Sequence, residues 1–122
     1  MVVYFDASPS PHTTIAVVFC NNDQCNEYIK DIDVEMTNNQ AEYLSLIYAL
    51  SLLSSFGVQD EVIVRGDSQL VINQMKGVYR VKNEKLKPLY KIAKICLSNF
   101  KNVEFQWVPR EKNLAGRLLE KR

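Results

Sequence analysis

The sequence has no apolar run near the roughly 18 residues that a membrane-spanning helix needs. It also has no basic segment followed by an apolar one of the kind that directs secretion, and no linker, repeat or low-complexity segment. We therefore expect a cytoplasmic protein that does not span a membrane. Its 122 residues, with 47% hydrophobic and 24% charged side chains, predict one globular domain over residues 1–122, which we expect to be a monomer.

Cysteine and histidine are scarce, with three Cys and one His in the chain. Cys20 and Cys25 lack the paired CxxC or Cys/His spacing of a zinc site, so they argue against bound zinc. They flank a turn at residues 21–24, which predicts that they face each other within disulfide reach on neighbouring strands. Reduced thiols are the ordinary expectation in the cytosol, whereas an oxidised pair would fit a hyperthermophile. Cys96 lies in an apolar helical pattern and is predicted to be a core residue.

Strand and helix patterns follow one another in an order typical of an α/β domain. β-Branched and aromatic runs predict strands at 2–7, 13–20, 25–34, 61–65 and 103–108. Apolar residues at helical spacing predict one helix from the capping box of Thr37 and Gln40 to Gly57, and others at 68–76, at 83–100 with an irregularity at Pro88, and from 114 onward. The first three strands form an antiparallel meander, and strands separated by helices run parallel. We therefore predict a five-stranded mixed sheet with helices packed on it.

Three carboxylates occupy positions that folding alone explains poorly. Asp6 interrupts an apolar strand, Glu42 lies in an apolar helix, and Asp67 ends a strand and precedes a helix. Each also has an ordinary explanation: Asp6 as a cap of the turn at 8–11, Glu42 as a partner of the helix dipole, and Asp67 as a helix N-cap. If the fold brings the three together, they form an oxygen cage for hard divalent cations, and such a cage performs phosphoryl-transfer chemistry.

A basic excess lies in the second half of the chain. Only one acid, Glu84, accompanies a set of cations between residues 76 and 94, namely Lys76, Arg80, Lys82, Lys85, Lys87, Lys91 and Lys94. Such an excess suggests a polyanionic partner, and a solvated helix face is the equally open alternative.

Four short motifs occur in a fixed order: Tyr-Phe-Asp at 4–6, Thr-Asn-Asn-Gln-Ala-Glu-Tyr at 37–43, Gly-Asp-Ser-Gln at 66–69, and Trp-Val-Pro-Arg-Glu-Lys-Asn at 107–113. Together they resemble type 1 ribonuclease H, particularly its compact archaeal-like branch, over nearly the whole chain. The resemblance implies a ribonuclease H-like α/β fold with helices packed on both faces of the sheet. It also implies that Asp6, Glu42 and Asp67 hold two ions, Mg²⁺ or Mn²⁺, for hydrolysis of the RNA strand of RNA–DNA hybrids.

Substrate contacts are implied by the same resemblance. Thr37 and Asn83 match a pocket for a phosphate of the DNA strand, and Asn38, Asn39 and Gln69 match positions that touch the minor groove and the RNA 2′-hydroxyls. The segment between Gly77 and Asn83 is too short for the basic protrusion of some family members, so we expect Arg80 and Lys82 to help bind hybrid. The ordinary alternatives are a helix cap for Thr37 and turn formation for Asn38 and Asn39.

The family's fourth carboxylate, an Asp in the first turn of the last helix, is missing here. No Asp follows Trp107, and the position falls on Asn113, Gly116 or Arg117, depending on where a gap is placed. Only Asn113 offers a neutral oxygen. We therefore predict Asn113 as a catalytic residue and metal ligand, with an N-cap of the last helix as the alternative.

The leading prediction is thus an endoribonuclease of RNA–DNA hybrids. A catalytically weak or inactive nucleic-acid-binding domain of the same fold is the alternative that the missing Asp favours. A nuclease acting on DNA or double-stranded RNA is a third possibility, and the motif at Thr37–Asn39 together with Gln69 argues against an enzyme restricted to DNA.

Overall fold

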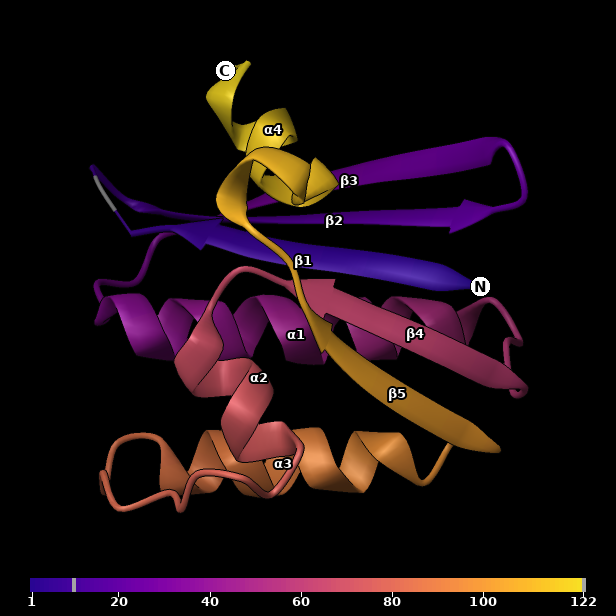
Figure 1. Ribbon diagram of the computed structural model, residues 1–122. Coiled ribbons are helices and arrows are strands. Elements are labelled where there is room, and N and C mark those ends of the chain that lie inside the picture. Colours follow the sequence, from indigo (N-terminus) through magenta and orange to yellow (C-terminus); the bar gives the residue numbers. More distant parts are fainter. Residues whose placement is uncertain (10, 122) are drawn as a thin grey trace.

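Five strands form one mixed sheet in the computed structural model, which describes residues 1–9 and 11–121 (Figure 1). The strands are β1 (Val2–Ser8), β2 (Thr13–Asn21), β3 (Gln24–Ile32), β4 (Glu61–Gly66) and β5 (Asn102–Trp107), in the order β3-β2-β1-β4-β5. β1, β2 and β3 form an antiparallel meander, and β4 runs parallel to both β1 and β5. The predicted five-stranded mixed sheet is confirmed.

Helices cover both faces of this sheet. They are α1 (Asn38–Ser55), α2 (Gln69–Met75), α3 (Lys87–Leu97), a short 3-10 helix η1 (Arg110–Lys112) and α4 (Leu114–Glu120). Figure 1 shows α1, α2 and α3 on one side of the sheet and α4 on the other. The predicted packing on both faces is therefore confirmed. The last helix was predicted from residue 114 onward, and residue 122 lies outside the described residues.

The long helix α1 is fixed at its start and buried along its length. At its N-cap, Thr37 Oγ1 accepts a hydrogen bond from Gln40 N at 3.2 Å, and Gln40 Oε1 accepts one from Thr37 N at 2.9 Å, so the predicted capping box is present. Its apolar face packs in one cluster with Val3 and Phe5 of β1. Full burial of each large apolar side chain contributes about 2 kcal/mol, so α1 is firmly set against β1.

The predicted helix at 83–100 is shorter than expected. Asn83 Oδ1 accepts a hydrogen bond from Lys85 N at 2.8 Å, which stabilises a turn, and α3 begins only at Lys87. Pro88 lies in the first turn of α3, in agreement with its predicted place in or near the early turns. It causes no irregularity there, because its missing N–H leaves no intrahelical bond unmade.

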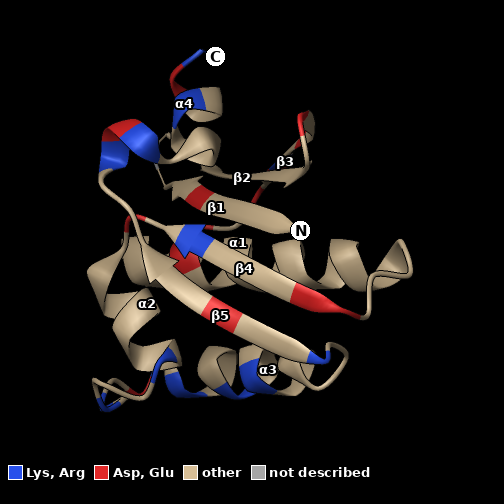
Figure 2. Ribbon diagram, turned by 45° about the vertical axis from the view of Figure 1, so that its right-hand side comes forward, with Lys and Arg blue, Asp and Glu red and all other residues tan. Residues whose placement is uncertain are grey.

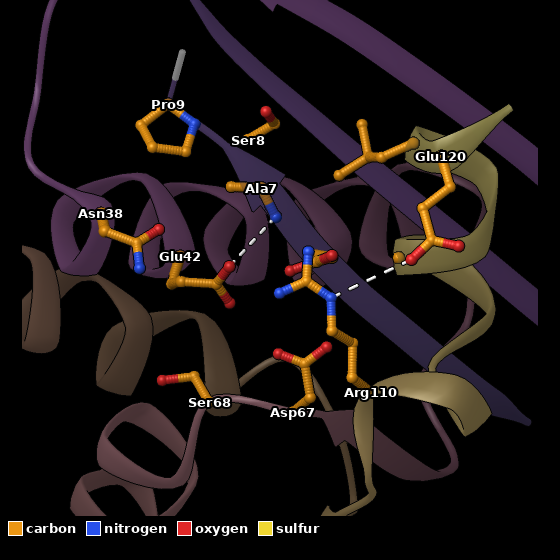
Figure 3. Close-up of a pocket in the computed structure, with 12 residues that line it drawn as sticks. Ala7, Ser8, Pro9, Asn38, Glu42, Asp67, Ser68, Arg110 and Glu120 are labelled. Carbon is orange, nitrogen blue, oxygen red and sulfur yellow. Dashed lines mark hydrogen bonds and ion pairs between the residues drawn. The ribbon is translucent and has the colours of Figure 1, made fainter. Parts of the chain in front are cut away.

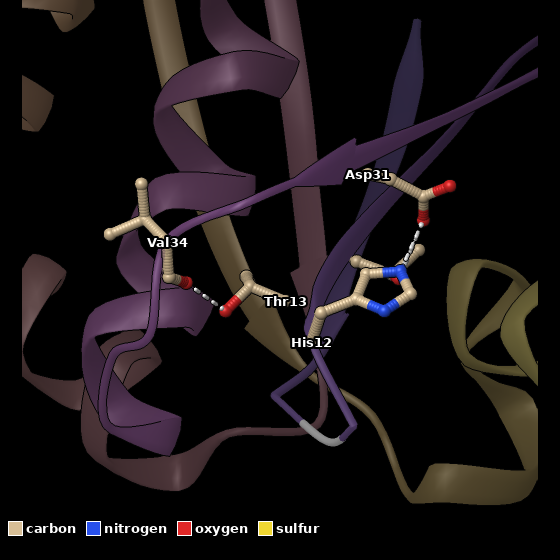
Figure 4. Close-up of polar contacts among 5 residues, drawn as sticks. His12, Thr13, Asp31 and Val34 are labelled. Carbon is tan, nitrogen blue, oxygen red and sulfur yellow. Dashed lines mark hydrogen bonds and ion pairs between the residues drawn. The ribbon is translucent and has the colours of Figure 1, made fainter.

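The β2–β3 hairpin is closed by a disulfide at one end and by polar contacts at the other. Cys20 and Cys25 are register partners, as predicted, but they form a disulfide rather than the reduced pair expected for the cytosol. At the opposite end, Thr13 Oγ1 donates to Val34 O at 3.0 Å and His12 Nε2 lies 3.4 Å from an Asp31 carboxylate oxygen (Figure 4). The first contact holds the chain between β3 and α1, and the second joins the start of β2 to the end of β3.

Basic side chains gather along α3 and the loop before it, below the sheet in Figure 2. Cys96, on the same helix, is half-buried against the core instead of fully inside it. Among the described residues, no helix combines the length and the apolar character needed to cross a membrane.

Candidate active site

The carboxyl ends of β1 and β4 lie side by side, and three acidic side chains meet there. Asp6 belongs to β1, Glu42 to α1, and Asp67 directly follows β4. Each carboxylate offers one oxygen, and these oxygens all lie within 4.8 Å of one another. The three residues line a pocket of about 650 Å³ (Figure 3). The structure therefore places Asp6, Glu42 and Asp67 together, as the sequence resemblance implies.

Asp6 is a strand residue and not a turn cap. It pairs with Ala16 in the β1–β2 register, and its exposed fraction is only 7%. Burial raises the pKa of Asp6, its hydrogen bond with Glu42 lowers it, and the nearby charge of Asp67 raises it further. The turn-capping explanation is therefore wrong, because the carboxylate is buried inside the site.

Glu42 is the most perturbed carboxylate of the group. It is 5% exposed, and its Oε1 accepts a hydrogen bond from Ala7 N at 3.1 Å. Its Oε2 is buried and receives no hydrogen bond from an N–H or hydroxyl group of the described residues. Burial, the hydrogen bond to Asp6 and the charges of Asp6 and Asp67 together raise the pKa of Glu42 to about 10. At neutral pH the Asp6–Glu42 pair therefore shares one proton.

Asp67 is not the cap of α2. That role belongs to Ser68, whose Oγ accepts a hydrogen bond from Val71 N at 3.2 Å, so the N-cap explanation for Asp67 is wrong. Instead, Asp67 Oδ2 accepts a hydrogen bond from Asn113 Nδ2 at 3.1 Å. Its backbone oxygen accepts one from Trp107 Nε1 at 3.0 Å. These contacts hold the side chain toward Asp6 and Glu42.

Gly66 explains how β4 comes so close to β1 before Asp67. A Cβ atom at Gly66 would lie 2.6 Å from the ring of Phe5, far inside the contact distance of two carbon atoms. Only glycine therefore lets the ring of Phe5 pack on the end of β4.

The donor set fits a hard divalent cation. All three residues offer carboxylate oxygens, the ligands that Mg²⁺ and Mn²⁺ prefer. A buried polar atom without a partner is rare in native proteins, and a cation would satisfy Glu42 Oε2. Loading the site would displace the proton that Asp6 and Glu42 share.

Asn113 reaches the site but does not fit the predicted role of metal ligand. Its Oδ1 accepts a hydrogen bond from Ala115 N at 3.2 Å and so caps α4. Its Nδ2 donates to Phe5 O at 3.0 Å and to Asp67 Oδ2 at 3.1 Å. These partners fix the orientation of the amide, whose oxygen is committed to the helix. The structure therefore supports the alternative left open by the sequence: Asn113 is the N-cap of α4, and its amide nitrogen positions Asp67.

Gly116 occupies the position that faces Asp6. A Cβ atom there would lie 2.9 Å from Asp6 Oδ2, and Gly116 lines the pocket of the three carboxylates. Arg117 is exposed and lines a different pocket. Of the three alternatives left open by the sequence, Gly116 is the one that lines this pocket and faces Asp6, and it brings no side chain.

The predicted substrate-binding residues fall into three places. Thr37, Asn39 and Asn83 line a common pocket of about 510 Å³. Asn38 lines the carboxylate pocket, and Gln69 begins α2 beside it. The remaining two lie farther along the chain: Arg80 lines a groove with Tyr79 and Tyr90, and Lys82 is exposed nearby in sequence.

Several residues that line the carboxylate pocket were not predicted as site residues, Ser68 and Glu120 among them. Ser68 lies within the Gly-Asp-Ser-Gln motif, where its capping spacing could have marked it. Glu120 lies outside every motif. Its only signal is a spacing of four residues from Gly116, which has meaning only once Gly116 is placed at the site.

Comparisons with known proteins agree with this geometry. Residues 5–121 match the model of the family described as "Reverse transcriptase-like". The crystal structure of RNase H1 from Halobacterium salinarum superposes with a TM-score of 0.87 at 32% identity, covering 97% of this chain and 92% of that one. LC11-RNase H1, solved in complex with RNA/DNA hybrid, superposes with a TM-score of 0.84 at 40% identity, covering 96% and 91%.

A curated relative shows how much of a longer protein the match covers. The "Bifunctional protein Rv2228c" of Mycobacterium tuberculosis is 39% identical over 77 residues, which is 63% of this chain and 21% of that protein. The match thus spans about a fifth of that relative's length.

Proposed function

Because the chain belongs to the type 1 ribonuclease H family, we propose that it is an endoribonuclease that hydrolyses the RNA strand of RNA–DNA hybrids with two divalent cations. The observation that carries the proposal is the convergence of Asp6, Glu42 and Asp67 within 4.8 Å, with a buried Glu42 oxygen that lacks a partner. That combination is costly for folding alone and is suited to cations.

Asp6, Glu42 and Asp67 would hold the ions, Mg²⁺ or Mn²⁺. When bound, such a pair of ions activates a water molecule and stabilises the charge on the leaving oxygen of the phosphodiester. The chain prepares the site beforehand. Ala7 N–H orients Glu42, and the Asn113 amide orients Asp67, so these carboxylates need little rearrangement to bind.

Substrate recognition would use the surface on either side of the carboxylates. The pocket of Thr37, Asn39 and Asn83 is suited to a phosphate of the DNA strand, since the start of α1 offers free N–H groups beside it. Asn38 and Gln69 can reach the RNA strand next to the carboxylates, where the 2′-hydroxyl distinguishes RNA from DNA. Arg80 and Lys82 add positive charge along the path of the backbone.

A labelled RNA–DNA hybrid tests this function directly. We expect cleavage of its RNA strand in the presence of Mg²⁺ or Mn²⁺, and none of duplex DNA. Single-stranded and double-stranded RNA serve as further substrates. Asp67→Asn should abolish cleavage, whereas Asp60→Asn, the same change at an exposed position before β4, should leave it intact. Equal cleavage by wild type and Asp67→Asn would contradict the proposal.

One observation favours the alternative function, a nucleic-acid-binding domain of the same fold with weak or no catalytic activity. Gly116 supplies no charge where the family has a carboxylate, so the second ion would be held loosely. Mn²⁺ stands higher than Mg²⁺ in the affinity of divalent ions for protein ligands, and we expect it to support faster cleavage. Hybrid binding without cleavage under both ions would favour this alternative.

A further inference from the structure

The turn of α4 that faces Asp6 leaves space above the carboxylates. Gly116 is buried there, and its position contributes only backbone to the pocket. Asn113 cannot fill the space, because its oxygen caps α4 and its nitrogen donates to Asp67. Arg117 is a cation that lines another pocket. Any fourth anionic ligand must therefore come from elsewhere.

Glu120 lies one helical turn after Gly116 and lines the same pocket as Asp6, Glu42 and Asp67. Residues four apart share a helix face and are separated by about 6 Å along the axis. Helical side chains lean toward the N-terminus, so the side chain of Glu120 extends back over the turn of Gly116. Figure 3 shows its carboxylate turned toward Arg110, another residue that lines this pocket.

Arg110, which lines the same pocket, forms a weak ion pair with Glu120. Arg110 Nε lies 4.0 Å from Glu120 Oε1, and the two side chains are 78% and 64% exposed. An exposed ion pair of this length contributes little stability, so exchanging Arg110 for a stronger cation costs little. The carboxylate is therefore close to the site and free to move into it.

We propose that Glu120 supplies the fourth carboxylate of the cation site, from the turn after the position where the family has an Asp. The inference rests on the proposed two-ion function. It also rests on Glu42 Oε2, which is buried in a residue of 5% exposure and receives no hydrogen bond from an N–H or hydroxyl group of the described residues, so that a cation in the pocket would have this oxygen as a ligand. The longer side chain of Glu compensates for its starting point one turn farther along α4.

Binding of Mn²⁺, followed by electron paramagnetic resonance and calorimetry, tests the proposal independently of activity. Glu120→Gln keeps the shape of the side chain and removes its charge. We expect about tenfold weaker binding of the more weakly held ion, since affinity for hard cations follows the number of charged ligands. Glu111→Gln is the matched control, because Glu111 is an exposed acid on η1 outside the carboxylate pocket, and should bind Mn²⁺ as wild type does.

The same substitution made in Arg110→Gln protein distinguishes direct ligation of the cation by Glu120 from an indirect effect through Arg110. In Arg110→Gln protein, Glu120 has lost its partner, and adding Glu120→Gln should still weaken Mn²⁺ binding about tenfold. If Glu120→Gln has no effect in that background, Glu120 acts only through Arg110 and the proposal is overturned.

The proposed function and this inference fail in different ways. Wild-type affinity for both ions in Glu120→Gln, with hybrid cleavage retained, would overturn the role of Glu120 and leave the ribonuclease function standing. Absence of Mn²⁺ binding and of cleavage in the wild-type protein would overturn both.

Discussion

The proton shared by Asp6 and Glu42 makes the stability of the metal-free protein depend on pH. The pKa of Glu42 is raised from 4.5 to about 10, so the folded protein keeps a proton that the unfolded chain loses above about pH 4.5. The folded state then binds more protons than the unfolded state across this window. The free energy of unfolding is therefore largest below about pH 4.5 as far as this group is concerned, and it falls as the pH rises toward 10.

The magnitude follows from the same linkage. One retained proton changes the free energy of unfolding by about 1.4 kcal/mol per pH unit, so raising the pH from about 6 to about 8 should cost roughly 3 kcal/mol. For a domain of this size, that loss lowers the melting temperature by about 9–15 °C. Glu42→Gln carries no ionisable group at this position, so its melting temperature should lose most of this dependence on pH.

Thermal melting of wild type and Glu42→Gln in a chelating buffer from pH 6 to pH 8 measures the difference. Glu61→Gln, at the exposed start of β4, is the control for loss of an ordinary carboxylate. Other titrating groups are common to these proteins and cancel in the comparison. Added Mg²⁺ should displace the proton and stabilise wild type more at pH 8 than at pH 6. Parallel pH profiles for wild type and Glu42→Gln would refute the reasoning.

Four further substitutions test the site's framework. Asp67→Asn should slow hybrid cleavage at least about a hundredfold, because cation-bound carboxylates account for several kcal/mol, while melting without metal stays at or above the wild-type temperature. Asn113→Ala removes the cap of α4 and the donor to Asp67, and should cost about 2–3 kcal/mol in urea unfolding; Asn113→Asp should lose stability without a gain in cleavage. Gly66→Ala forces a methyl group against Phe5, and its unfolding midpoint in urea should fall by the equivalent of about 1–3 kcal/mol.

Much of the fold was predictable because local patterns and connection rules point the same way. Alternating β-branched runs define the strands, and a turn at 21–24 sets the β2–β3 register that makes Cys20 and Cys25 partners. The oxidation state of that pair was not predictable, because the spacing gives proximity whereas the expected compartment argued for thiols. The predicted start of α3 was also wrong. Asn is a common helix N-cap, but Asn83 instead accepts a hydrogen bond from Lys85 N and forms a turn before the helix.

The roles of Asp67 and Asn113 show where sequence reasoning ends. An Asp before a helix is an ordinary N-cap, yet the neighbouring Ser68 takes that role and leaves Asp67 for the site. Asn113 offers both an oxygen and a donor, and its sequence does not say which one faces the carboxylates. The orientation of the amide is decided by its contacts with Phe5, which is far away along the chain, and with Ala115, which is two residues away.

Which residue faces Asp6 at the position of the family's fourth carboxylate depends on where α4 begins, and one sequence alone does not fix that start. Capping by Asn113 makes Leu114 the first helical residue, and each following residue turns about 100° around the axis. Gly116 then faces Asp6, Arg117 lines a separate pocket with Glu111, and the face of Gly116 returns at Glu120. In place of an Asp in the first turn of α4, the proposed ligand is thus a Glu in the second turn. The chemistry of the site depends on whether that longer side chain reaches the same cation.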